Sequence, residues 1–425
     1  MATIEHIQAH EIIDSRGYPT LEGTVITSSG MTMTSSVPVT YEKNKYGAEA
    51  LLDEDPGKMD GNGVEKAVRY VNELIAPRLQ HVDVTRQKDI DAWLLTADGT
   101  KNKSRLGANV TLLISQLMAK AAAAEQKLSL FRYVNSLYKQ WYRDTIALDR
   151  VPIPIFNILN GGKHANTSIE FQEFQIIPSS SLTFEKAYMQ GIALYHDLRN
   201  VLLYRGAYVS VGEEGGFSPN FSSNIDALEI LMELFNKNKL RAGLDIFLGV
   251  DVASDSFYKD ERYLIKDKPH PLKRDEYIEY ILHLVNAYSL LLVEDPINQD
   301  DWDGWKQLSA KLSEKVYIVG DDFLAGNAQR FKKAVEEKAC TTVSIKPIEI
   351  GTVSEILQLV QEARSVNASY IISHCLGETN DTFAADLAVG VQADFVKFGA
   401  PSRGERVVKY NRLWTIEREE LHATA

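Results

Sequence analysis

The chain has 425 residues, of which 44% are hydrophobic, and a formal net charge of -12. This length is sufficient for two or three domains with a large core. The negative charge and the lack of a long lysine or arginine run argue against a nucleic-acid-binding protein. Two cysteines are too few for a disulfide framework. No stretch has the roughly 18 apolar residues that a membrane span needs.

The N-terminal residues argue against export from the cell. They contain charged and polar side chains and lack the apolar segment of a signal peptide. We therefore expect a cytoplasmic protein whose partners include neither nucleic acid nor a membrane.

Residues 1–140 combine strand and helix patterns, which predicts an α+β domain. The strand patterns are rich in β-branched side chains, and the helix patterns repeat apolar residues at helical spacing. The predicted strands are residues 4–14 and 20–27, and the predicted helices are residues 64–79 and 108–126. Residues 39–47 are polar and aperiodic, which is typical of a loop.

The pattern changes near residue 150, where short apolar runs begin to alternate with stretches of helical periodicity. These runs show little polar alternation, which is typical of strands covered by helices on both faces. They lie at residues 208–211, 246–250, 290–293, 316–319, 341–345, 369–372 and 394–396. The alternation predicts an α/β fold with a parallel sheet or barrel over residues 141–425.

An ionisable residue follows each of these runs. The residues are Glu214, Asp251, Glu294, Asp321, Lys346, His374 and Lys397. In a (β/α) barrel the C-terminal ends of the strands meet at one face, which holds the active site. A single acid after a strand can simply cap the next helix. Lysine is a poor cap, however, and the complete series therefore predicts a functional site.

Three carboxylates of this series predict a metal site. Asp251, Glu294 and Asp321 end successive strands. At about 4 Å, each ionised pair would repel by roughly 4 kcal/mol at an effective dielectric of 20. A cation between them removes this repulsion, and all-oxygen ligands favour Mg²⁺. The sequence therefore predicts one Mg²⁺ site at the mouth of the barrel.

The remaining residues supply the proton transfers that such a site needs. Lys346 and Lys397 are expected on the other side of the barrel, and Lys346 would act as the base because lysine near cations can lose its proton. Glu214, helped by Glu173, would exchange a proton with a leaving hydroxyl. A metal on the substrate carboxylate favours loss of the α-proton. We therefore predict a lyase that acts on a small carboxylate.

Long motifs resemble those of the enolase family over nearly the whole chain. Among the most specific are EIIDSRGYPTLE (11–22), NILNGGKHAN (157–166), VGEEGGFSPN (211–220), SIKPIEIGTVSE (344–355) and KYNRL (409–413). The resemblance implies an enolase-like modified (β/α)8 barrel with an N-terminal α+β lid domain. It also implies a glycolytic lyase that converts 2-phosphoglycerate to phosphoenolpyruvate as a homodimer or homo-octamer.

The same resemblance implies roles for individual residues. The metal would bind Asp251, Glu294 and Asp321, with Lys346 as base and Glu214 as acid beside Glu173. The implied substrate-binding residues are His164, Gln172, His374 and Lys397. A lone histidine is more often structural, so the two histidines are candidates through the motifs alone.

The residues after His374 depart from the family pattern. The family has an arginine and a serine there that hold the substrate phosphate, whereas this chain has Cys375 and Leu376. Charge-assisted hydrogen bonds to a phosphate are worth about 1.5–3 kcal/mol each, so their loss would cost roughly 10²-fold or more in binding or rate. The candidates for a replacement charge are Lys43, Lys45 and Arg403.

Two further segments differ from the family. The loop at residues 38–47 lacks the family's serine, which binds a second Mg²⁺, and this leaves a second metal site open. Glu349 adds an acid three residues after Lys346.

These departures leave three hypotheses. The chain is an enolase with a rearranged phosphate site, a diverged relative acting on another hydroxy-carboxylate, or a non-catalytic enolase-like binding protein. The first two share one mechanism, in which Mg²⁺ holds the carboxylate, Lys346 removes the α-proton and Glu214 assists loss of a β-group. Retention of the metal ligands and the base favours a working enzyme.

Overall fold

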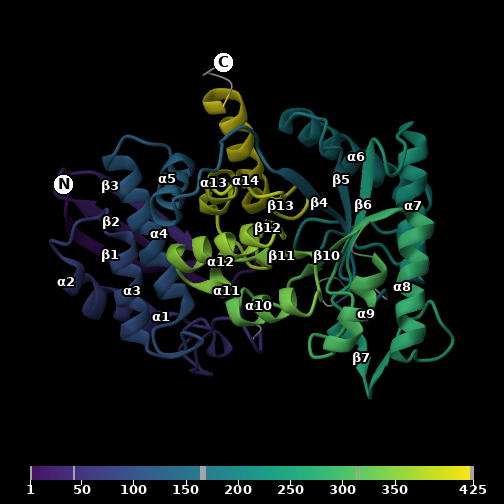
Figure 1. Cartoon of the computed structure of the whole chain (residues 1–425), viewed down its shortest axis with the longest axis horizontal. Coiled ribbons are helices and arrows are strands. Elements are labelled where there is room, and N and C mark those ends of the chain that lie inside the picture. Colours follow the sequence, from purple (N-terminus) through teal and green to yellow (C-terminus); the bar gives the residue numbers. More distant parts are fainter. Residues whose placement is uncertain (1, 42–43, 163–168, 313, 315, 422–425) are drawn as a thin grey trace.

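The computed structural model describes residues 2–41, 44–162, 169–312, 314 and 316–421. An N-terminal sheet with its helices lies beside a closed barrel, which is surrounded by further helices (Figure 1). Within these residues, no helix combines the length and the apolar character that crossing a membrane requires.

A three-stranded antiparallel sheet begins the chain. Its strands, in order, are β1 (Ile4–Ile13), β2 (Pro19–Thr27) and β3 (Thr32–Val37). Asp14 fixes the turn between β1 and β2, because its Oδ1 accepts hydrogen bonds from the backbone N–H groups of Arg16 and Tyr18 at 2.8 and 2.9 Å. The predictions of β1 and β2 are confirmed. β3 was missed because threonine and serine dominate it and obscure the strand pattern.

Helices follow this sheet in the chain, and those at residues 65–79 and 108–125 pack against it. The helices are α1 (Glu65–Arg69), the π-helix η2 (Tyr70–Ile75), α2 (Ala76–Leu79), α3 (Gln87–Asp98), α4 (Ala108–Glu125) and α5 (Leu130–Tyr142), preceded by the short 3-10 helix η1 (Met59–Gly61). The first three follow one another without a break, in agreement with the helix predicted at residues 64–79. Gly23 of β2 permits close packing of α4, since a Cβ there would lie 3.1 Å from side-chain carbons of Leu113 and Leu117.

Eight strands close into a barrel. Around the barrel they are β4 (Ile153–Asn160), β5 (Glu173–Pro178), β6 (Ile246–Asp251), β9 (Leu290–Glu294), β10 (Tyr317–Gly320), β11 (Thr342–Ile345), β12 (Ser369–Ser373) and β13 (Phe395–Lys397). β5 runs antiparallel to β4 and β6, whereas the other neighbouring strands are parallel. The prediction of a parallel barrel is therefore wrong at β5.

Helices follow most barrel strands and form the outer layer (Figure 1). They are α6 (Phe184–Tyr204), α7 (Asn224–Lys237), α8 (Arg274–Tyr288), α9 (Trp302–Leu312), α10 (Ala328–Glu336), α11 (Pro347–Ile350), α12 (Val353–Ser365), α13 (Phe383–Gly390) and α14 (Gly404–Thr415). Smaller elements are η4 (Ser254–Phe257), the hairpin of β7 (Tyr258–Lys259) and β8 (Arg262–Tyr263), and η5 (Ile416–Leu421).

The strand predicted at residues 208–211 is wrong, whereas the six later runs coincide with β6 and β9 to β13. Tyr208 and Val211 are 72% and 44% exposed, and Val211 forms only an isolated bridge with Phe217. A β-branched run without a neighbouring strand does not enter the barrel. The first strand of the barrel is β4 instead. It was not predicted because it contains Pro154, and proline is disfavoured inside sheets.

A mostly buried ion pair connects the N-terminal sheet to the barrel. Asp381, just before α13, accepts hydrogen bonds from Lys120 Nζ of α4 (2.6 Å) and from Ser35 Oγ and the Ser36 backbone N–H of β3 (2.9 Å each). Burial acts to raise the pKa of Asp381, but Lys120 and the Ser36 N–H hold it below its ordinary value.

We predict that Asp381→Ala lowers the free energy of unfolding by about 2 kcal/mol at pH 7, because Lys120, which is mostly buried, loses its carboxylate partner and keeps only the Thr34 carbonyl oxygen. A lowered pKa stabilises the fold above the ordinary value of about 3.9 and loses that contribution below it. The difference from wild type, measured by urea denaturation, should therefore shrink between pH 5 and pH 3.

The control for this prediction is Asp303→Ala, which removes an exposed partner of Lys306. That change should cost less than about 0.5 kcal/mol. Equal stability of Asp381→Ala and the control at pH 7 would contradict the structural role of the ion pair.

Candidate active site and metal centre

The C-terminal ends of the barrel strands open into a cavity of about 310 Å³. The predicted site residues that line it are Gln172, Glu173, Glu214, Asp251, Asp321, Lys346, His374 and Lys397. Glu294 is fully buried and joins the carboxylates of this cavity. His164 lies outside the described residues.

Three strand ends bring three carboxylates together. Asp251 ends β6, Glu294 ends β9 and pairs with it in register, and Asp321 follows β10. One oxygen of each lies within 4.8 Å of the others. Within the described chain, Glu294 Oε1 and Asp321 Oδ1 are buried and have no hydrogen-bond partner. Buried carboxylate oxygens without partners, at this spacing, fit the oxygen ligands that Mg²⁺ prefers.

Both lysines form ion pairs with these carboxylates. Lys397 Nζ lies 2.8 Å from Glu294 Oε2 and 3.4 Å from oxygens of Glu173 and Asp251. Lys346 Nζ lies 2.5 Å from Asp321 Oδ2. Lys397 ends β13, four strands from β9, so it starts on the other side of the barrel as predicted, and its side chain crosses the interior. Lys346 follows β11, which pairs with β10, so the prediction is wrong for Lys346.

These contacts change the proton affinities of the site. Burial raises the pKa of Asp251 well above its ordinary value, and Glu294 adds to the rise. Burial opposes the ammonium form of Lys346, but Asp321 and Glu349 raise its pKa well above the usual value. The carboxylates thus hold Lys346 as an ammonium ion, contrary to the expectation of a lowered lysine pKa. A base at this position requires that the charge of Asp321 be offset.

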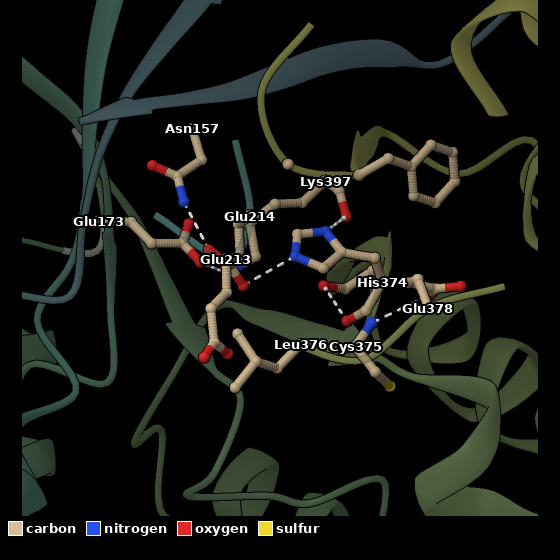
Figure 2. Close-up of polar contacts among 12 residues, drawn as sticks. Asn157, Glu173, Glu213, Glu214, His374, Cys375, Leu376, Glu378 and Lys397 are labelled. Atoms are coloured by element: carbon tan, nitrogen blue, oxygen red, sulfur yellow. Dashed lines mark hydrogen bonds and ion pairs between the residues drawn. The ribbon is translucent and has the colours of Figure 1, made fainter. Parts of the chain in front are cut away.

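Glu214 lies on the loop before α7, held by side chains on both of its oxygens (Figure 2). Its Oε2 accepts hydrogen bonds from the amides of Asn157 (2.6 Å) and Asn160 (3.3 Å), and its Oε1 lies 2.9 Å from His374 Nε2. Sequence reasoning missed both asparagines. Their signal was two amides, three residues apart, in an otherwise apolar strand.

The hydrogen bonds of His374 indicate that the proton between His374 and Glu214 lies on Glu214. Burial and Arg406 lower the pKa of His374, so the ring is neutral at pH 7. Its Nδ1 lies 2.7 Å from the Lys397 carbonyl oxygen, which can only accept, and Nδ1 therefore carries the hydrogen. Nε2 is then an acceptor, which requires that the Glu214 carboxyl donate (Figure 2).

Two glutamines hold neighbouring acids. Gln172 Nε2 donates to Asp251 Oδ2 at 3.4 Å, and Gln175 Nε2 donates to Glu173 Oε2 at 2.7 Å. Burial raises the pKa of Glu173 well above its ordinary value, and Glu214 adds to the rise. Glu173 therefore holds a proton more tightly than an ordinary glutamate does.

Cys375 and Leu376 form the cavity wall next to His374 (Figure 2). Burial raises the pKa of the Cys375 thiol well above its usual value, so the thiol is uncharged. Arg406, which is fully buried, donates a 2.7 Å hydrogen bond to the carbonyl oxygen of Cys375 and another to that of Leu376. Its guanidinium is thus engaged by the backbone of this wall.

Two candidates for a replacement charge pair with other carboxylates, although Lys45 also lines the cavity, and the third lies outside the described residues. Lys45 and Arg403 each form an ion pair at 3.0 Å with a carboxylate other than those of the metal cluster, and Lys43 is not among the described residues. Arg16 also lines the cavity, where its Nε lies 3.0 Å from Glu213 Oε2. Sequence reasoning missed Arg16, which lies far from the barrel strands in the chain.

A second group of acids has a structural explanation. Oxygens of Asp295, Asp321 and Asp322 also lie within 4.8 Å of one another. The Asp295 carboxylate accepts hydrogen bonds from the backbone N–H groups of Asp321 and Asp322 at 3.0 and 2.6 Å. It therefore stabilises the turn that follows β10.

Comparison with known proteins agrees with this architecture. The model of the enolase N-terminal domain matches residues 4–134, and the model of the enolase C-terminal TIM barrel domain matches residues 149–425. The chain belongs to the enolase family. A protein named enolase from Acidothermus cellulolyticus is 41% identical over 419 residues, which cover 99% of this chain and 95% of that protein. The predicted enolase-like α/β fold is confirmed.

We predict that Glu294→Gln weakens Mg²⁺ binding at least about tenfold, because an amide carries no charge and offers one oxygen instead of two. Isothermal titration calorimetry measures the affinity. The matched control is Glu229→Gln in α7, whose carboxylate accepts a hydrogen bond from Tyr288 outside the cavity. An unchanged affinity in Glu294→Gln would remove this residue from the metal site.

Proposed function

We propose that this protein is a Mg²⁺-dependent lyase of the enolase type, which removes the α-proton of a carboxylate substrate and eliminates a β-group. Membership of the enolase family makes it a carbon–oxygen hydro-lyase. The observation that carries the proposal is a carboxylate cluster with unpartnered oxygens next to Lys346, whose Nζ is 2.5 Å from Asp321, at one cavity.

We assign the metal to Asp251, Glu294 and Asp321. Bound there, Mg²⁺ would stabilise negative charge on the substrate carboxylate and offset the charge of Asp321 that holds Lys346 as an ammonium ion. Lys346 Nζ accepts the proton as the α-carbon–hydrogen bond breaks. Lys397, which contacts three carboxylates, keeps a positive charge close to the substrate carboxylate.

We assign the role of acid to Glu214. The neutral His374 ring leaves the proton on the Glu214 carboxyl, which can pass it to a leaving hydroxyl so that water departs. Glu173 lies beside Glu214, and burial together with Glu214 raises the pKa of Glu173. Gln172, His374 and Lys397 complete the proposed substrate-binding residues, together with His164.

The first candidate substrate is 2-phosphoglycerate, with phosphoenolpyruvate and water as products. A second candidate, another hydroxy-carboxylate, is favoured by the cavity wall at Cys375 and Leu376, because an uncharged thiol and a leucine offer a phosphate no charge. Arg406 lies behind this wall, but its guanidinium donates hydrogen bonds to the backbone of the wall. This engagement also favours a substrate without a phosphate.

Membership of the enolase family supports further proposals about the domains, the cellular location and the assembly of the protein. We propose a domain boundary at residue 140, which falls between the segments matched by the two enolase domain models. We also propose a cytoplasmic, glycolytic enzyme that assembles as a homodimer or homo-octamer.

We predict that wild-type protein with Mg²⁺ exchanges the α-proton of 2-phosphoglycerate for solvent deuterium and forms phosphoenolpyruvate. Lys346→Ala should lower the exchange rate by roughly 10²–10⁴-fold, because the base is removed. Nuclear magnetic resonance follows exchange and product together. The control is Lys311→Ala, which removes an exposed partner of Glu279.

The outcomes of this experiment separate the candidates. Exchange that persists in Lys346→Ala excludes this residue as the base. If 2-phosphoglycerate is inert at millimolar concentration but another hydroxy-carboxylate exchanges its α-proton, the second candidate is correct. If no carboxylate of the panel shows Mg²⁺-dependent exchange, the proposed activity is wrong and a non-catalytic binding role replaces it.

A further inference from the structure

Glu349 is a buried carboxyl beside Lys346 to which the mechanism above gives no role. It belongs to the one-turn helix α11 and is only 7% exposed. Its Oε1 lies 3.7 Å from Lys346 Nζ, and its Oε2 is buried without a hydrogen-bond partner in the described chain. A buried carboxyl oxygen without a partner costs free energy, so the residue requires an explanation.

The short helix fixes Glu349 relative to Lys346. The spacing of three residues puts both side chains on the same side of the turn. The Glu349 backbone N–H donates to the Lys346 carbonyl oxygen at 3.0 Å, and the Glu349 carbonyl oxygen accepts from the Ala48 N–H at 2.9 Å. Gly351 ends the turn at a φ of 103°, a conformation that favours glycine. The carboxyl is therefore held at the cavity by a rigid backbone.

We propose that Glu349 is a positioning residue that holds the Lys346 amino group while Asp321 is engaged by the metal ion. Among the described residues, two carboxyl groups lie within 4.0 Å of Lys346 Nζ, those of Asp321 and Glu349. A divalent ion on Asp321 would offset the charge of that carboxylate and would repel an ammonium group. Glu349 is then the carboxyl within reach whose Oε2 makes no other hydrogen bond.

The charged groups around Glu349 set the conditions for a test. Burial raises its pKa to about 8, against the lowering by Lys346, and Asp321 and Asp322 add to the rise. Cys375, on the neighbouring cavity wall, also faces this group. All variants are therefore compared at one pH, 8.5, which lies above this value.

This inference rests on the proposed function, and it is tested with Glu349→Gln, which keeps shape and removes charge, and Glu349→Asp, which keeps charge. The substrate is 2-phosphoglycerate, or the hydroxy-carboxylate that wild type exchanges. For Glu349→Gln we expect α-proton exchange to fall by about 10–100-fold, because a displaced reacting group loses rate steeply. KM should change less than about threefold, since the carboxylate ligands of the ion are intact.

Two further measurements separate positioning from packing. Calorimetry should give Glu349→Gln a Mg²⁺ affinity about 3–10-fold weaker than wild type, because Lys346 is left against the ion without its second partner. Glu349→Asp should recover part of both losses. The matched control is Glu355→Gln. Glu355 lies on α12, and its carboxylate pairs with Lys103 at 2.9 Å. This change should alter neither the exchange rate nor the Mg²⁺ affinity.

The results for wild type and the Glu349 variants distinguish three cases. If wild type exchanges the proton and Glu349→Gln matches it in exchange and Mg²⁺ affinity, the inference is overturned and the proposed function stands. If Glu349→Gln and Glu349→Asp lower the melting temperature, change KM and slow exchange to the same extent, the residue acts in packing. That result also overturns the inference. A wild type that neither binds Mg²⁺ nor exchanges the proton overturns the proposed function, and the inference with it.

Discussion

Buried negative charge at the mouth of the barrel is the constraint on which the rest of the site depends. Asp251, Glu294 and Asp321 converge there because β6, β9 and β10 are short parallel strands that end at one level. Carboxylates this close and this buried cannot all remain ionised without nearby positive charge. Lys346 and Lys397 supply part of it, and the raised pKa of Asp251 reflects the remainder.

This electrostatic balance links binding to chemistry. A divalent ion would complete the neutralisation of the carboxylates and would weaken the hold of Asp321 on Lys346. On the opposite side of the cavity, Asn157, Asn160 and His374 fix a Glu214 carboxyl that donates a proton. The site therefore separates a proton acceptor from a proton donor, which is the arrangement that elimination needs.

The sequence predicted most of the elements but not all of their directions. Six apolar runs became barrel strands because covered strands are continuous and apolar, and the ionisable residues at their ends therefore share one face. The run at residues 208–211 had the same composition, but it lacks a neighbouring strand, which only the assembled fold reveals. The antiparallel β5 and the reach of Lys397 across the barrel are also properties of packing, and local patterns do not record them.

The central claim is that the native barrel mouth binds Mg²⁺, and thermal unfolding of the wild-type protein with Mg²⁺ or with a chelator tests it most directly. An ion that binds only the native state stabilises it by about 2.7 kcal/mol at 100 times its dissociation constant. The account predicts a higher melting temperature with Mg²⁺, and the shift should be reduced in Glu294→Gln. Identical melting temperatures of the wild type with saturating Mg²⁺ and with the chelator would contradict it.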